Sequence, residues 1–380
     1  MPIIVVSPFN VINFPEGGGH FWVYMQYVQG LRQSGCDVYW MEKFRGAEGS
    51  TRRLEPFLAR MEQFGLGRNL ILYTNAGPSG SQGPIDYVGR SRSEAEAIFK
   101  EADLLLNFHY AIDPALLRLF RRSALVDIDP GLLQFWINRE QLSVPRHDLY
   151  FTTGETVGTP TARFPDCGLD WKKIRPPICL EQWPYSYDPS REAFTTVSNW
   201  DADDWIVDRQ TRFENTKRAA FLEFADLPQY TSQPLELALY LRTEKDAAER
   251  RELEKRGWRI RLSTEVARTP EAYQTYVQQS RGEFSCAKRS CVTFQNAWIS
   301  DRTLCYLASG KPAVVQHTGP SSFLPNGEGL FRFCTPREAA SAFQTINADY
   351  ARHCRAARKL VETYFDAKHI VRKLLSDALN

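Results

Sequence analysis

Residues 298–319 read WISDRTLCYLASGKPAVVQHTG, and this stretch decides the predicted fold. Ser300 stands where a helix N-cap is expected, and Gly310 stands where that helix should end. The apolar run 312–316 follows at once as a buried strand, and Gly319 opens the loop after it. A helix joined directly to a buried strand is typical of α/β proteins, which bind ligands at the carboxyl ends of their strands.

The same alternation of apolar runs and amphipathic stretches extends outward from this unit in both directions. In the second half we predict strands over 194–197, 235–241, 258–262 and 312–316, and helices over 213–224, 244–256, 300–307 and from 269. The stretch 337–379 is almost wholly helical in pattern. In the first half we predict strands over 3–6, 37–41, 70–73, 104–108, 124–128 and 149–152, all of which one twisted sheet could hold.

A domain junction is predicted where prolines crowd together between 159 and 189 without an amphipathic run. A chain of 380 residues also exceeds the size at which one core usually keeps growing. The predicted fold is therefore α/β, with two doubly wound Rossmann-like domains facing across a cleft. The expected ranges are an acceptor-side domain over 1–175, a linker over 176–190, a donor-binding domain over 191–355 and C-terminal helices over 356–380 that could cross back to the first domain.

Composition excludes several classes of protein. The formal net charge is +2 with no block of like charge, which gives nucleic acid no support as a partner. No run of about 18 apolar residues could span a membrane, and the start lacks a basic leader, so we expect a cytoplasmic protein. The eight cysteines are scattered without ligand spacing, so reduced thiols are expected and no metal is assigned; Cys286 and Cys291 are the nearest pair.

The first segment that could carry chemistry is the glycine run Gly17, Gly18 and Gly19, between the first strand and the first helix. Without Cβ atoms the backbone amides can approach a ligand closely, and the following helix points its positive end there, so an anionic group is expected. The spacing is not Gly-x-Gly-x-x-Gly, which disfavours a nicotinamide dinucleotide. The alternative is that the glycines only permit a tight turn.

His20 follows this run at the start of the helix. Its ordinary pKa near 6.5 would let the imidazole act as a general base toward an acceptor hydroxyl. Alternatively, a neutral His20 only hydrogen-bonds the loop or a ligand. No orienting aspartate can be identified from the sequence.

The second segment is the helix start and strand end within 298–319. Arg302 could neutralise a phosphate, Asp301 could accept hydrogen bonds from a ribose, and the backbone of Thr318 and Gly319 could approach a diphosphate or sugar. Alternatively, Asp301 only favours the helix N-terminus and Arg302 is a solvated surface charge. The full predicted donor set adds the neighbours of these residues, Ser300 and His317.

Two further groups are weaker candidates. A stretch over 198–205, rich in Asp, follows the first strand of the second half, and Lys217 or Arg212 beyond it could meet phosphate. His109, Tyr110 and Asp129 follow strands of the first half and could line an acceptor pocket, although packing or capping explains them equally well.

Together these features resemble the nucleotide-sugar-dependent glycosyltransferases of the GT-B architecture. The similarity rests on the glycine run with His20, the helix-Gly-x-Pro-strand unit over 304–315, the Gly-Glu-Gly-Leu turn over 327–330 and the helical tail. Many members carry a ribose-binding Glu five residues before the Gly of that unit, where this chain has Cys305. The paired glutamates of many retaining members are also missing, which favours inversion.

The resemblance implies a hexosyltransferase that moves a sugar from a nucleotide diphosphate sugar to a hydroxyl of a small-molecule or glycan acceptor. It implies metal independence, no cofactor beyond the nucleotide sugar as co-substrate, and His20 as the catalytic base. Two other functions remain open on the same fold: a nucleotide-sugar epimerase or hydrolase, and a non-catalytic protein that binds a nucleotide or sugar.

Overall fold

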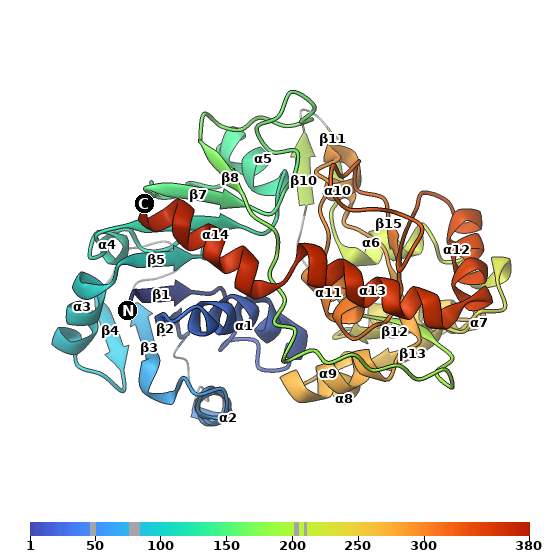
Figure 1. Ribbon diagram of the computed structural model, residues 1–380, viewed down its shortest axis with the longest axis horizontal. Helices are drawn as coiled ribbons and strands as arrows, with labels where there is room; N and C mark the ends of the chain where they lie inside the picture. Colours follow the sequence, from blue (N-terminus) through green and yellow to red (C-terminus); the bar gives the residue numbers. More distant parts are fainter. Residues whose placement is uncertain (46–50, 76–83, 201–204, 209–210) are drawn as a thin grey trace. The chain divides into compact units, whose positions relative to one another are not determined.

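The computed structural model describes residues 1–45, 51–75, 84–200, 205–208 and 211–380. The chain divides into two compact units (Figure 1). Unit 1 comprises Met1–Gly154, Pro165–Pro177 and Ala367–Asn380, and unit 2 comprises Glu155–Phe164 and Ile178–Asp366.

Unit 1 is built on an eight-stranded sheet in the order β4-β3-β2-β1-β5-β6-β7-β8. Every neighbouring pair is parallel except the edge pair of β3 and β4. The strands are β1 (Ile3–Ser7), β2 (Asp37–Lys43), β3 (Leu70–Asn75), β4 (Ile85–Val88), β5 (Leu104–Asn107), β6 (Ser123–Asp127), β7 (Leu149–Thr152) and β8 (Trp171–Lys173). The chain winds outward from β1 and then returns to β5 on the other side of β1, which is the doubly wound order.

The helices of unit 1 connect these strands and end with the last helix of the chain. They are α1 (Gly18–Gln33), α2 (Thr51–Gln63), α3 (Arg92–Glu101), α4 (Pro114–Leu117), α5 (Leu132–Asn138) and α14 (Ala367–Leu379). α14 packs on α1 (Figure 1), and a Cβ on Gly30 of α1 would lie only 2.8 Å from a methyl group of Val371. The absence of a side chain at Gly30 therefore permits this close helix contact.

Unit 2 repeats the winding with a six-stranded, all-parallel sheet in the order β13-β12-β9-β14-β15-β16. Its strands are β9 (Phe194–Asn199), β12 (Leu235–Tyr240), β13 (Arg259–Leu262), β14 (Gly282–Ser285), β15 (Ala313–Gln316) and β16 (Leu330–Phe333). A separate antiparallel hairpin pairs β10 (Trp205–Asp208) with β11 (Thr211–Glu214). The direction of winding reverses between β9 and β14.

The helices of unit 2 are α6 (Lys217–Leu222), α7 (Glu244–Lys255), α8 (Ser263–Val266), α9 (Pro270–Gln278), α10 (Arg289–Phe294), α11 (Asp301–Ala308), α12 (Pro336–Ala348) and α13 (Tyr350–Tyr364). The predicted helix over 213–224 is wrong in its first part. Phe213 pairs with Ile206 in the hairpin, and Thr216 caps α6 by accepting a bond from the Ala219 amide at 3.2 Å. The helix therefore starts at Lys217.

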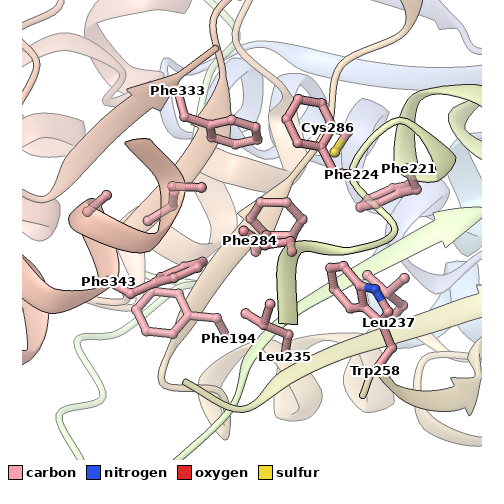
Figure 2. Packing of buried hydrophobic residues seen from close by; sticks show 14 of the residues in the cluster. Phe194, Phe221, Phe224, Leu235, Leu237, Trp258, Phe284, Cys286, Phe333 and Phe343 are labelled. Atoms are coloured by element: carbon pink, nitrogen blue, oxygen red, sulfur yellow. The ribbon is translucent and has the colours of Figure 1, made fainter. Parts of the chain in front are cut away.

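An aromatic core holds unit 2 together between its sheet and α6 and α12. Figure 2 shows Phe284 of β14 at the centre, among Phe333 of β16, Phe343 of α12 and Phe221 of α6. The rings of Phe284 and Phe333 are stacked with centroids 5.3 Å apart. Aromatic side chains bury large apolar areas, so this cluster fixes the positions of the strands whose ends carry the site.

The structural units differ from the expected domain ranges in three places. Residues 155–164 belong to unit 2, where Phe164 packs on Phe294 with ring centroids 5.8 Å apart. The expected linker belongs to unit 2 from Ile178 onward, and the carbonyl of Trp183 accepts a bond from Arg358 of α13 at 2.7 Å. Residues 356–366, which include the end of α13, belong to unit 2, whereas α14 belongs to unit 1, the return to the first domain that the sequence allowed.

Candidate functional site

The carboxyl ends of the parallel strands in unit 1 bring its predicted site residues to one edge of the sheet. β1 and β5 are neighbours in the sheet, so the loops that follow them diverge at a switch point. The chain after β1 leads to Gly17 and His20, and the chain after β5 leads to His109 and Tyr110.

The three glycines start a helix and do not form a separate loop. Gly17 is the N-cap of α1, and Gly18 and Gly19 lie in its first turn. A Cβ on Gly17 would lie 2.4 Å from the ring of Phe14, so packing alone requires glycine there. No side chain caps α1. Binding of a diphosphate by Gly17, Gly18 and Gly19 stays a prediction.

His20 is held by a hydrogen bond of its ring. Its Nε2 lies 2.7 Å from the carbonyl oxygen of Phe9. Because a carbonyl only accepts, Nε2 carries the proton and Nδ1 keeps the lone pair. Burial lowers the pKa of His20, while the Phe9 bond and the charge of Asp129 partly oppose this shift. Asp129 therefore lies within electrostatic reach of the His20 imidazole, and the role of His20 as a base stays a prediction.

Tyr110 and Asp129 meet in a hydrogen-bonded network around Asp127 at the end of β6. Asp127 is buried and accepts bonds from Gln134 Nε2 and Thr152 Oγ1, each at 2.8 Å. The hydroxyl of Tyr110 donates to Asp127 at 3.3 Å and accepts from the Asp129 amide at 3.2 Å. Burial raises the pKa of Asp127 to about 7, although these side-chain bonds oppose the shift. The Tyr110 hydroxyl therefore holds the chain after β6 in place.

A cavity of about 640 Å³ opens at the same edge of unit 1, within the range of ligand pockets. His109 lines it, and the ring of His109 packs on that of Phe9 with centroids 5.1 Å apart. Burial lowers the pKa of His109 to about 4, with help from the charges of Lys43 and Arg45 in the same lining. Of the three predicted acceptor residues, only His109 lines this cavity.

In unit 2, Arg302 turns inward at the switch point between β9 and β14. Its Nε donates to the buried carboxylate of Glu283 on β14 at 2.8 Å, and its Nη1 donates to the carbonyl of Val197 on β9 at 3.1 Å. A third bond reaches the hydroxyl of Ser285. The guanidinium is thus engaged with the sheet and is not a solvated surface charge. Its predicted role toward phosphate stays untested.

Lys217, the first residue of α6, lies near Arg302 at this switch point. Its amine donates to the carbonyl oxygen of Cys286 at 2.5 Å and lies 5.6 Å from the centre of the Trp298 ring. Burial, and then the charge of Arg302, lower the pKa of Lys217 to about 8. No described carboxylate forms an ion pair with it. Residues 201–204 of the acidic stretch lie outside the described residues, and Arg212 is exposed on β11.

The loop after β15 is fixed to the segment before α11. The Thr318 hydroxyl donates to the carbonyl of Trp298 at 2.7 Å, and the Ala297 amide donates to the carbonyl of Thr318 at 2.9 Å. Gly319 has φ +123°, and a Cβ there would lie 2.6 Å from the carbonyl of Gln295. Glycine is therefore required by conformation and by contact.

His317 and Ser300 stabilise the two sides of this loop. The Gly319 amide donates to His317 Nδ1 at 3.1 Å, and burial followed by the charge of Arg332 lowers the pKa of His317. Ser300 caps α11 by accepting a bond from the Arg302 amide at 3.3 Å, and Asp301 occupies the first turn. A pocket of only about 20 Å³ lies between these segments.

Several candidate residues escaped the sequence prediction. Glu283 lies on β14, a four-residue strand that begins with glycine and has no alternating pattern. Lys43 and Arg45 stand at and just after the carboxyl end of β2. Their position at the end of a predicted parallel strand is the signal that could have identified them.

The described residues contain no group of three or more His, Cys, Asp or Glu side chains that could hold a metal ion. Of the described helices, none combines the length and the apolar character that crossing a bilayer would require.

Neither a family model nor a curated protein matches this chain. Solved structures do. The chain is similar to an alpha-glucosyltransferase in complex with UDP and a 13-mer DNA, with a TM-score of 0.63, 11% identity and full coverage of both chains. It is similar to HepE of Anabaena in complex with UDP and glucose, with a TM-score of 0.60, 13% identity and 99% of each chain covered.

A third similar structure is sucrose-phosphate synthase from Thermosynechococcus elongatus, with a TM-score of 0.57, 12% identity, and 99% of this chain and 98% of that chain covered. The predicted architecture is confirmed: the chain has the GT-B fold of these glycosyltransferases over its whole length. At such identities the likeness establishes the fold, and function must be argued from the residues.

Proposed function

We propose that this protein transfers a sugar from a nucleotide diphosphate sugar, with UDP as the nucleotide, to a hydroxyl of a small acceptor. The observation that carries the proposal is the ionic arrangement at the unit 2 switch point. There Lys217 is a partly buried cation without a described carboxylate partner, at the strand edge where such folds bind ligands. Two of the similar structures, the alpha-glucosyltransferase and HepE, hold UDP, which selects the nucleotide to test first.

In this proposal Lys217 and the N-terminus of α11 bind the donor diphosphate. With its pKa lowered to about 8, the Lys217 amine is still mostly protonated at pH 7. A phosphate oxygen would receive a charge-assisted hydrogen bond from it. The first-turn amides of α11 lie nearby, and helix N-termini favour anions. Arg302 is expected to assist diphosphate binding in two ways. It orients β9 and β14, and its positive charge attracts the diphosphate.

His20 is proposed as the base that activates the acceptor. Its Nδ1 accepts the hydroxyl proton while the acceptor oxygen forms a bond to the anomeric carbon, and the bond from that carbon to the diphosphate oxygen breaks. The electron pair leaves with UDP, so the anomeric configuration inverts. Asp129 stabilises the imidazolium that forms. The step requires no metal, so chelation with EDTA should leave the rate unchanged.

The acceptor is proposed to be small because the cavity of about 640 Å³ in unit 1 has the size of a small-ligand pocket. One similar structure holds DNA. The net charge of +2 on 380 residues, however, supplies little of the electrostatic attraction that governs binding to phosphate backbones. We therefore propose a small-molecule or glycan acceptor. We also propose that the transfer takes place in the cytoplasm.

The test is a thermal-shift series of the purified chain with UDP, GDP, TDP, ADP, CDP and inorganic phosphate. A ligand at about 100 times its Kd stabilises the folded state by roughly 2.7 kcal/mol, a readily measured shift. We expect selective stabilisation by UDP. If none of the nucleotides raises the melting temperature at millimolar concentration, the proposal fails.

UDP release from UDP-sugars distinguishes the other two functions. A transferase releases UDP faster when an acceptor is added, and a hydrolase releases UDP at a rate independent of acceptor. An epimerase releases no net UDP but converts the UDP-sugar to its epimer, which NMR of the donor detects. A binding protein would be stabilised by UDP and release none from the sugar donor.

A further inference from the structure

The cavity of unit 1 contains two cations that no described carboxylate compensates. Lys43 and Arg45 both line it, and neither forms an ion pair within 4.0 Å in the described part of the chain. Their charges reach the cavity interior, because both contribute to the lowered pKa of His109 in the same lining.

Both acidic side chains of the lining are already bonded within the cavity wall. Glu42 accepts a bond from the indole of Trp40 at 2.9 Å and further bonds from the amides of Val11 and Ile12. Asp113 caps α4 by accepting from a first-turn amide at 2.8 Å. The cations are therefore left to interact with a ligand.

Asn10 supplies a second, independent observation. It lines the cavity in the left-handed conformation, with φ 62°. Its Oδ1 is buried and has no hydrogen-bond partner among the residues described. A buried acceptor without a partner is unfavourable, and strained residues of this kind concentrate at functional sites.

We propose that this cavity binds the acceptor through an oxyanion, either a phosphate monoester or a carboxylate on a small polyhydroxylated molecule. Lys43 and Arg45 bind the anion from the wall of the cavity. This inference rests on the proposed function, because it names the acceptor class for the same transfer. An anion satisfies both cations at once, and guanidinium and ammonium groups form their strongest hydrogen bonds with oxyanions.

The test measures binding of three hexose probes to the full chain by calorimetry: glucose 6-phosphate, glucuronate and uncharged glucose. The variant is the double substitution Lys43→Gln and Arg45→Gln. The charge-matched control is Lys100→Gln with Arg121→Gln, two exposed residues that precede β5 and β6 and so lie toward the opposite edge of the sheet. Melting temperatures without ligand show whether the variants fold.

We expect at least one charged probe to bind about tenfold or more tightly than glucose, the cavity variant to lose about tenfold in affinity, and the control to match the wild type. The stronger of the two charged probes identifies the anion. The inference is overturned if no charged probe binds, if glucose binds equally well, or if a folded cavity variant binds like the wild type.

A parallel titration with UDP separates this inference from the proposed function. If UDP binds and the charged probes do not, only the acceptor class is wrong. If the charged probes bind through Lys43 and Arg45 but UDP does not bind, the cavity is an anion site and transfer from a UDP-sugar is refuted.

Discussion

The imidazole of His20 donates through Nε2 to the carbonyl of Phe9 at 2.7 Å, so only Nδ1 can receive a proton. We expect His20→Ala to lower kcat by a factor of about 10² to 10⁴, the usual contribution of a general base. UDP affinity should change little, because Lys217 of unit 2 is proposed to bind the diphosphate.

The pH profile of kcat/KM gives a second readout for His20. Burial lowers its pKa below the ordinary 6.5, so the neutral, proton-accepting form persists to lower pH. Activity should be flat from pH 7 upward to about 8 and fall only below 6.5, and the acid limb should disappear in His20→Ala. The control is His369→Ala, at an exposed position of α14. An acid limb that survives in His20→Ala would show that another group is the base.

Arg302 and Glu283 form an ion pair with side-chain exposures of 11% and 0%. Arg302→Met should destabilise the chain by roughly 3–5 kcal/mol, because it leaves a buried carboxylate unpaired. Combining it with Glu283→Gln should restore most of that stability, as measured by denaturant unfolding. If Arg302→Met is as stable as the wild type and loses only UDP binding, the arginine acts chiefly on phosphate.

Some interactions between single residues could not be predicted from the sequence. The sequence identified Arg302 and His20 as polar residues beside predicted ligand loops. It could not reveal that the Arg302 guanidinium faces Glu283, or that Asp129 lies within electrostatic reach of His20. Both relations join residues distant in the chain, and they depend on which strands become neighbours in the sheet.

At the scale of elements, the contact of α1 with α14 depends on Gly30. A Cβ there would lie 2.8 Å from a Val371 methyl carbon and 3.1 Å from the Cβ of Ala367. Gly30→Ala should therefore destabilise the chain despite its better helix propensity. With Val371→Ala in the same chain the clash is relieved, so the two changes should deviate from additivity by about 0.5–3 kcal/mol in denaturant unfolding. Strict additivity would show that the helices do not pack this closely.

Most strands could be predicted from apolar runs, because buried parallel strands are continuous and short. β7 matches its predicted range of 149–152, and β1 extends the predicted run by one residue to Ser7. The hairpin of β10 and β11 could not be predicted in this way. The two strands pair with each other in a separate hairpin and not with the main sheet. Phe213 was therefore predicted to lie in the same helix as Phe221.

At the scale of the molecule, the main sheets of the two units have the same topology. In each, the chain first adds strands on one side of the first strand and then adds strands on its other side. The alternation of runs in the sequence was enough to predict two such units. The helical tail allowed a return to the first domain, but its pattern did not show that the return begins at Ala367, because α13 and α14 are amphipathic in the same way. The cavity of unit 1 could not be predicted either, since residues in or after the carboxyl ends of β1, β2, β3 and β5 all contribute to it.

The most direct test of the account is a calorimetric titration of UDP at pH 7 without added metal, comparing the wild type with Lys217→Gln. The control is Lys245→Gln, at an exposed position of α7. The account predicts binding to the wild type and to the control, and an affinity at least about tenfold lower for Lys217→Gln. Absence of UDP binding, or unchanged affinity in a folded Lys217→Gln variant, would contradict it.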